Sequence, residues 1–151
     1  MRIVLLEDNP IQVEPMREEF FRCRLCSQKE DLLYIRTESE FMARLEEIKR
    51  FQPHVVVVDV MVMWATPSPN TPERPAKVKE EGYFLAGVRC AEALHQMMAG
   101  VPLIFYTIVD PVDLEPYLRE NAALVIVPKG PYLSELVEKI RAVVQATGER
   151  Q

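Results

Sequence analysis

Five side chains that can take part in chemistry stand at the ends of short apolar runs in this sequence. They are Glu7, Asp8, Asp59, Thr107 and Lys129. Three carboxylates brought close together repel one another, so they either hold protons at neutral pH or bind a cation. Oxygen ligands with room for water suit Mg²⁺. A cation, a lysine and a hydroxyl that face a nucleophilic carboxylate can stabilise a phosphoryl group during its transfer.

These side chains can meet only if the apolar runs before them are strands of one parallel sheet. The run Val55–Val58 predicts a strand buried on both faces, because consecutive β-branched residues cannot show one apolar and one polar face. Similar runs at residues 3–6, 101–107 and 124–127 predict further buried strands, and residues 31–37 predict another. Ligands bind at the carboxyl ends of such strands, although an acidic residue there can also simply begin a turn.

Helical patterns lie between the predicted strands. The segment from Thr37 to Glu40 has the spacing of a capping box, and apolar residues recur at helical intervals from there to Phe51. A helix is also expected from the first strand through Leu25, although Pro15 should kink it or delay its start. The remaining helices are predicted over residues 84–98, 114–118 and 133–144.

The alternation of strand and helix predicts a doubly wound α/β fold, with a five-stranded parallel sheet and helices on both faces. We expect the flavodoxin-like strand order 2-1-3-4-5. Strands 1 and 3 are then neighbours, so Glu7, Asp8 and Asp59 should converge at one rim. Strands 4 and 5 should bring Thr107 and Lys129 to the same rim.

The segment 64–82 interrupts this alternation. It contains Pro67, Pro69, Pro72 and Pro75, which rule out a regular helix or a central strand across that part. We interpret the segment as a long Pro-rich inserted loop. Loops of this length in compact domains tend to be functional or mobile, so a lid, a partner surface and a tolerated insertion are all open.

The composition bounds the class of protein. A chain of 151 residues fits one domain, 1–151, and its 48% hydrophobic and 27% charged residues argue against disorder. The net charge of −5 and the lack of a Lys/Arg-rich run disfavour direct binding of nucleic acid. No apolar segment approaches the roughly 20 residues that span a bilayer, and no signal peptide is evident. We therefore expect a cytoplasmic protein with no membrane partner.

The cysteines and histidines do not form a convincing metal or redox site. Cys23 and Cys26 have C-x-x-C spacing, but no second Cys or His pair completes a tetrahedral zinc site. Cys90, His54 and His95 stand alone in the sequence. Structural roles are the simpler interpretation for all of them.

The acidic residues after strands 1 and 3, combined with Thr107 and Lys129 at the ends of strands 4 and 5, resemble the receiver domain of two-component response regulators. The resemblance covers nearly the whole chain, from Met1 to about Thr147, apart from segment 64–82. It implies that Asp59 is the phosphoacceptor. It also implies that Thr107 is the switch hydroxyl and that Lys129 contacts the phosphoryl group.

The resemblance further implies a Mg²⁺ site. Glu7 and Asp8 match the acidic pair of the family, and Asp8 would bind the metal directly. Asp59 and the backbone carbonyl of Met61, two residues after the acceptor, would complete the protein ligands.

As the resemblance implies, a histidine kinase or phosphotransfer protein donates the phosphoryl group, and a downstream protein partner or a homodimer reads the altered surface. The sequence departs from the family at three places. Ile108 replaces a small residue after the switch threonine, Gly130 separates Lys129 from Pro131, and Ile126 replaces the aromatic switch.

Three functional hypotheses follow. The first is a stand-alone, phosphorylatable receiver that is not an enzyme. The second is a receiver-like protein-interaction module that works without phosphorylation, which Ile108, Gly130 and the long loop favour. The third is a hydrolase, which the sequence disfavours because neither histidine follows a predicted strand.

Overall fold

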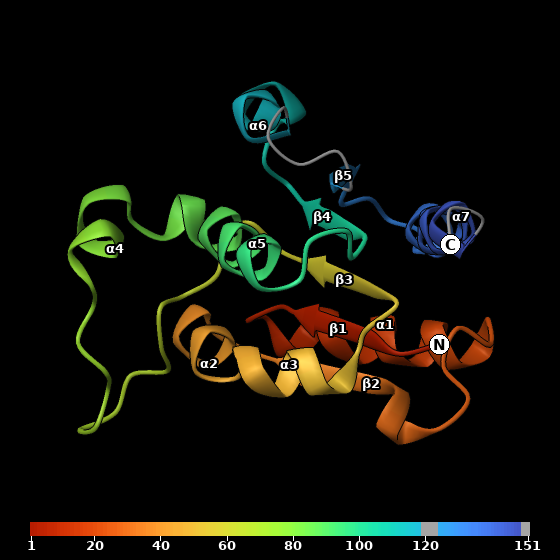
Figure 1. Cartoon of the computed structure of the whole chain (residues 1–151), viewed down its shortest axis with the longest axis horizontal. Coiled ribbons are helices and arrows are strands. Elements are labelled where there is room, and N and C mark those ends of the chain that lie inside the picture. The colour runs from red at the N-terminus through yellow and green to blue at the C-terminus, as the bar shows by residue number, and fades with distance from the viewer. Residues whose placement is uncertain (119–123, 149–151) are drawn as a thin grey trace.

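The computed structural model describes residues 1–118 and 124–148, which form a parallel sheet between two layers of helices (Figure 1). The strand order is β2-β1-β3-β4-β5 and every pair is parallel, as predicted. The strands are β1 Ile3–Leu6, β2 Leu32–Ile35, β3 Val55–Val58, β4 Leu103–Thr107 and β5 Leu124–Pro128. The fold is therefore the doubly wound, flavodoxin-like α/β arrangement.

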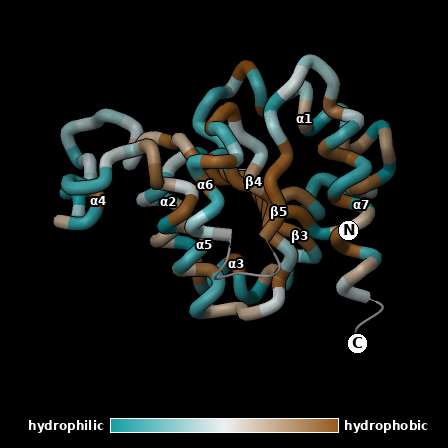
Figure 2. The backbone as a smooth tube through the Cα atoms, turned by 90° about the horizontal axis from the view of Figure 1, so that it is seen from above, coloured by the Kyte–Doolittle hydropathy of each residue, from teal (hydrophilic) through white to brown (hydrophobic). Residues whose placement is uncertain are grey.

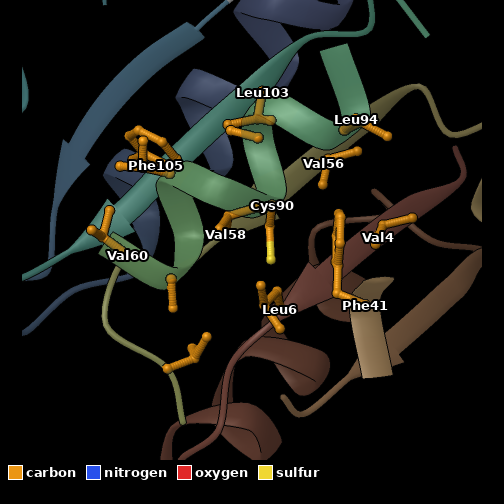
Figure 3. Packing of buried hydrophobic residues seen from close by; sticks show 14 of the residues in the cluster. Val4, Leu6, Phe41, Val56, Val58, Val60, Cys90, Leu94, Leu103 and Phe105 are labelled. Atoms are coloured by element: carbon orange, nitrogen blue, oxygen red, sulfur yellow. The ribbon is translucent and has the colours of Figure 1, made fainter. Parts of the chain in front are cut away.

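Helices cover both faces of this sheet. They are α1 Pro10–Arg22, α2 Glu38–Ala43, α3 Leu45–Phe51, α4 Ala76–Glu81, α5 Ala86–Met97, α6 Pro111–Leu118 and α7 Ser134–Gly148. One face packs against α1 and α7, which contribute residues such as Phe20 and Ile140. The other face packs against α2, α3, α5 and α6, with Phe41 and Leu94 among the buried residues (Figure 3). None of the helices in the described part is long and apolar enough to cross a membrane.

The central strand has the burial that its sequence predicts. All four residues of Val55–Val58 are fully buried, because the strand lies between β1 and β4 and is covered on both faces. In Figure 2 the strands form the hydrophobic centre of the molecule, whereas α4 lies at its side and is largely hydrophilic. Two short 3₁₀ turns, Lys29–Asp31 and Tyr83–Leu85, lead into β2 and α5.

Helix α1 differs in two ways from the sequence prediction. It begins at Pro10 without delay, and Pro15 lies inside it. Because proline has no N–H, Pro15 removes only the hydrogen bond to the carbonyl of Ile11. Ile11 is 82% exposed in the first turn, where water can satisfy that carbonyl. The helix ends at Arg22, so Leu25 lies outside it, after the left-handed residue Arg24.

The helix predicted up to Phe51 is two helices. Thr37 caps α2 as predicted, because its hydroxyl accepts a hydrogen bond from the Glu40 N–H at 3.2 Å. The helix is then interrupted at Arg44. The guanidinium of this residue forms ion pairs with Glu40 in α2 and Glu47 in α3. The Arg44 side chain therefore connects the end of α2 with the first turn of α3.

The inserted segment is partly helical, which corrects the prediction of a loop throughout. Helix α4 begins at Ala76, immediately after Pro75, and ends before Gly82, which has a φ of 72°. Proline is tolerated before a first helical turn, so the prolines exclude a helix only upstream of this point. Phe84, where the next helix was predicted to begin, lies instead in the 3₁₀ turn Tyr83–Leu85 and is 57% exposed.

Candidate functional site

The register of the sheet places Glu7 and Asp59 side by side at its carboxyl edge. Leu6 pairs with Val58, so the two acidic residues follow directly paired positions. The Asp59 N–H donates to the Leu6 carbonyl at 2.9 Å, which continues the ladder for one further residue. The neighbouring pair β4 and β5 ends in the same way, because the Lys129 N–H donates to the Thr107 carbonyl at 2.9 Å.

Lys129 joins the two carboxylates. Its ammonium nitrogen lies 2.6 Å from Glu7 Oε2 and 2.7 Å from Asp59 Oδ2. All three side chains are at most 10% exposed, so the contact is largely shielded from water. The second oxygen of Glu7 accepts the Asn9 N–H, and the second oxygen of Asp59 accepts the Met61 N–H. The predicted rim residues Glu7, Asp59 and Lys129 thus form one connected group.

Burial and charge act against each other in this group. Burial raises the pKa of Glu7 above its ordinary value of 4.5, although hydrogen bonds from Lys129 and the Asn9 N–H oppose the rise. Burial also disfavours the charged form of Lys129. Hydrogen bonds to Asp59 and Glu7 outweigh that effect and raise the pKa of Lys129 above 10.5. The lysine is therefore held as an ammonium ion at neutral pH.

Asp8 points to a different partner. Its Oδ2 atom accepts the N–H of Met63, the residue immediately before the inserted segment, at 2.8 Å. Within residues 1–118 and 124–148, no three His, Cys, Asp or Glu side chains are gathered as a ready-made metal site. Glu7 and Asp59 are instead both bound to the Lys129 ammonium, while Asp8 accepts a backbone donor.

The donor types at this rim nevertheless fit Mg²⁺. Glu7, Asp8 and Asp59 supply carboxylate oxygens, and Met61 adds a backbone carbonyl two residues after Asp59. The Oδ1 atom of Asp8 accepts no hydrogen bond from any described residue, so it is free for a cation. The assignment of these four residues as metal ligands remains a prediction.

Thr107 is completely buried at the end of β4, and its hydroxyl accepts the Val109 N–H at 3.3 Å. The following side chain, Ile108, is 71% exposed and extends into solvent. No described peptide bond is cis, and Gly130 has open space around it. Lys129 is therefore positioned by the β4–β5 ladder and its ion pairs.

Sequence reasoning missed three residues around this site. The Tyr34 hydroxyl donates to the Glu7 carbonyl at 2.8 Å, and the Lys129 ammonium lies 5.8 Å from the centre of the Tyr106 ring. Gly87, in the first turn of α5, lies very close to the loop that follows β3 and begins with Asp59, which we call the acceptor loop. A Cβ added at Gly87 would be 2.4 Å from the Asp59 carbonyl oxygen. A glycine inside a helical pattern was the only signal of this close approach.

Comparison with known proteins supports the fold. No protein-family model matches the chain, and no curated protein matches it. Solved structures do match over nearly its whole length. The N-terminal domain of a response regulator/sensory box/GGDEF 3-domain protein from Carboxydothermus hydrogenoformans has a TM-score of 0.68 at 15% identity, and the match covers 99% of this chain and 98% of that one.

Two further structures are similar to the chain. A CheY-like response regulator receiver domain protein from Methanospirillum hungatei JF-1 has a TM-score of 0.67 at 14% identity, with 99% and 98% of the two chains covered. The BeF3-activated N-terminal receiver domain of RstA from Klebsiella pneumoniae has a TM-score of 0.63 at 19% identity, with 95% and 98% covered. At such identities the similarity establishes the fold alone. The chain therefore has the fold of response regulator receiver domains, as its sequence motifs predict.

Proposed function

We propose that this chain is a phosphoacceptor receiver of a two-component phosphorelay, which takes a phosphoryl group on Asp59 from a histidine kinase or phosphotransfer protein. The observation that carries the proposal is the Lys129 ammonium, which lies 2.7 Å from Asp59 and 2.6 Å from Glu7 at the carboxyl edge of the sheet. A fixed cation beside a nucleophilic carboxylate is what phosphoryl transfer requires. The chain acts in the cytoplasm as a signalling module and not as an enzyme on outside substrates.

In the transfer step, an Asp59 carboxylate oxygen forms the new O–P bond. The bond between phosphorus and the donor breaks, and its electron pair leaves with the donor. Lys129 is released from one of its carboxylate partners and pairs with a phosphoryl oxygen, while the Thr107 hydroxyl donates to another. When bound, Mg²⁺ supplies positive charge against the carboxylates and the phosphoryl oxygens; Asp8, Asp59 and the Met61 carbonyl would hold it, with Glu7 acting through water.

Signal output passes to a protein partner or a second copy of the chain. Ile126 cannot act as an aromatic switch, so another element near Asp59 must report its state. The inserted segment is suited to this role because Met63, the residue immediately before it, is hydrogen-bonded to Asp8. A change at the acidic rim therefore reaches the insertion through a single contact.

The alternative is a receiver-like interaction module that works without phosphorylation. The observation that favours it is the same ion-pair group, because Lys129 already pairs with both Glu7 and Asp59 and so reduces the negative charge that would attract a metal. The two functions make opposite predictions about covalent modification.

The test is incubation with Mg²⁺ and acetyl phosphate, followed by intact mass spectrometry. The wild type should gain one phosphoryl group, and Asp59→Asn should gain none. Asp113→Asn, which removes an exposed carboxylate in α6, serves as the matched control and should be labelled like the wild type. An unmodified wild type would support the interaction module, whereas equal labelling of Asp59→Asn would exclude Asp59 as the acceptor.

A further inference from the structure

A cavity of about 660 Å³ lies between the inserted segment and the acidic rim. It shares Asp8 and Met61 with the proposed Mg²⁺ site, but the phosphoacceptor role does not use its other lining residues. Residues that line it include Asp8, Met61, Met63, Trp64, Arg74 and Tyr83. Its volume falls within the range of about 300–1,000 Å³ that is typical of small-molecule sites. We call it the insertion cavity.

The first wall of the insertion cavity is fixed to the domain by backbone contacts. The carbonyls of Met63 and Trp64 accept the N–H groups of Glu38 and Ser39, at 3.0 and 2.8 Å. These donors belong to the first turn of α2, where backbone N–H groups have no partner inside the helix. The indole N–H of Trp64 donates to the Pro72 carbonyl at 2.8 Å, which ties the two sides of the loop together.

The far end of the insertion is fixed by a single buried side chain. The Arg89 guanidinium donates to the Gly82 carbonyl at 2.8 Å and to the Glu81 carboxylate at 3.1 Å. Arg89 is only 5% exposed, and it is held in turn by Glu38. Both ends of the segment that lines the cavity are therefore attached to helices of the domain, the first to α2 and the second to α5, so the cavity is formed in advance of any ligand.

The lining combines apolar surface with one unpaired cation. Trp64, Met61 and Tyr83 offer flat or polarisable surface, which suits an aromatic ring. Among the charged residues of the lining, Asp8 already has a partner, because it accepts the Met63 N–H. Arg74 has no hydrogen bond or ion pair with any described residue.

A second carboxylate at the cavity is already neutralised. Glu38 lines the cavity, but both of its oxygens accept hydrogen bonds from Arg89. Arg74 is therefore the cation at the cavity that is free of a partner among the described residues, and guanidinium groups bind carboxylate, sulfonate or phosphate oxygens. Asp8 repels an anion, so it would orient such a ligand with its charged end away from the acidic rim.

We propose that the insertion cavity binds a small aromatic anion, with its ring against Trp64 and Tyr83 and its charged group on Arg74. The inference does not depend on phosphorylation of Asp59. A free small molecule is favoured over a partner's side chain because the cavity, although partly open to solvent, has the volume of a complete ligand site and is lined mainly by residues of the chain's own insertion.

The test uses two dyes with nearly the same ring system in the absence of Mg²⁺ and of any phosphodonor. Anilinonaphthalene sulfonate carries the anion, and N-phenylnaphthylamine lacks it. Dye fluorescence and calorimetry should show one sulfonate dye bound per chain, and the fluorescence of Trp64, the single tryptophan, should change on binding. Arg74→Gln should lower the affinity for the sulfonate dye about tenfold or more, because it removes a charge-assisted contact. It should lower the affinity for the neutral dye by less than about twofold.

Two control variants make the result specific. Arg50→Gln removes an exposed arginine of α3, outside the cavity, and should leave both affinities unchanged. Phe84→Ala removes the exposed ring that stacks on Tyr83 at 4.4 Å. Binding that survives in Phe84→Ala and fails in Arg74→Gln supports the proposal. The proposal is wrong if the dye binds at several sites, if Arg74→Gln and Arg50→Gln behave alike, or if Phe84→Ala abolishes binding while Arg74→Gln does not.

Discussion

Arg89 of α5 and Glu38 of α2 form a bidentate ion pair inside the protein, although 51 residues separate them in the sequence. The Nε–Oε1 and Nη2–Oε2 distances are 2.5 and 2.8 Å, and the two side chains are 5% and 1% exposed. Since Arg89 also binds Glu81 and Gly82, one guanidinium connects two helices with the end of the insertion.

Breaking this pair on one side should strongly destabilise the fold. Arg89→Met leaves the Glu38 carboxylate buried without a partner, which typically costs about 3–5 kcal/mol in the free energy of unfolding. Urea denaturation followed by circular dichroism measures the change. Lys77→Met removes an exposed pair with Glu92 and should cost less than about 1 kcal/mol. The double variant Arg89→Met/Glu38→Leu should recover much of the loss; a double variant no more stable than Arg89→Met would contradict this explanation.

The raised pKa of Glu7 predicts a pH-dependent stability difference between the wild type and Glu7→Gln. A carboxyl whose folded pKa lies above its unfolded pKa binds more protons in the folded state, so its contribution to stability is present in acid and is lost as the pH rises. We expect the wild type to lose stability relative to Glu7→Gln as the pH increases from about 4 through the raised pKa of Glu7.

Urea unfolding of both proteins at a series of pH values measures this difference. The exposed substitution Glu46→Gln in α3 is the control and should show no such trend relative to the wild type. A wild type that instead gains stability relative to Glu7→Gln as the pH rises would show that hydrogen bonds from Lys129 outweigh the effect of burial. In that case the pKa of Glu7 is lowered in the folded protein.

Mg²⁺ should stabilise the folded protein by mass action. A ligand that binds only the folded state at ten times its Kd adds about 1.4 kcal/mol, which is visible as a higher melting temperature. Asp8→Asn should lose most of the Mg²⁺-induced shift, and Asp113→Asn should keep it. Differential scanning fluorimetry at matched ionic strength is the measurement. The same shift in NaCl alone, or an undiminished shift in Asp8→Asn, would argue against the site.

The sequence predicted the sheet and its rim well because both follow from local patterns. Val55–Val58 is recognisable as a central strand from its own composition, and the register then places Asp59 beside Glu7 without further information. The position of Lys129, directly after β5, follows from the same rule, because residues that follow parallel strands meet at the carboxyl edge of the sheet. These features depend on strand identity and order, which hydrophobic periodicity encodes directly.

Contacts between distant segments could not be predicted in this way. Nothing local to Asp8 indicates that it accepts the Met63 N–H, and nothing local to Arg89 indicates that it pairs with Glu38. The helix inside the insertion was missed because prolines dominate the segment up to Pro75, and the short helix after it has few apolar residues. Its stability comes from tertiary contacts, in which Val78 is buried, more than from its own pattern.

Gly87 provides the most direct test of how closely α5 must approach the acceptor loop. Its N–H donates to the Val60 carbonyl at 2.8 Å, and an added Cβ would lie 2.4 Å from the Asp59 carbonyl oxygen and 2.6 Å from the Val60 Cα. Both neighbours are backbone atoms that cannot move aside as a flexible side chain does. Gly87→Ala should therefore lower the free energy of unfolding by about 1–3 kcal/mol, as overpacking in a core does.

The same substitution should also disturb phosphorylation, because the clash displaces the loop that carries Asp59. We expect slower labelling by acetyl phosphate under conditions where the variant is fully folded, as checked by circular dichroism. Gly130→Ala is the matched control, since no atom lies within 4 Å of its added Cβ even though it follows Lys129 directly. If Gly87→Ala is as stable as Gly130→Ala and is labelled at the same rate, α5 does not need to lie this close to the acceptor loop.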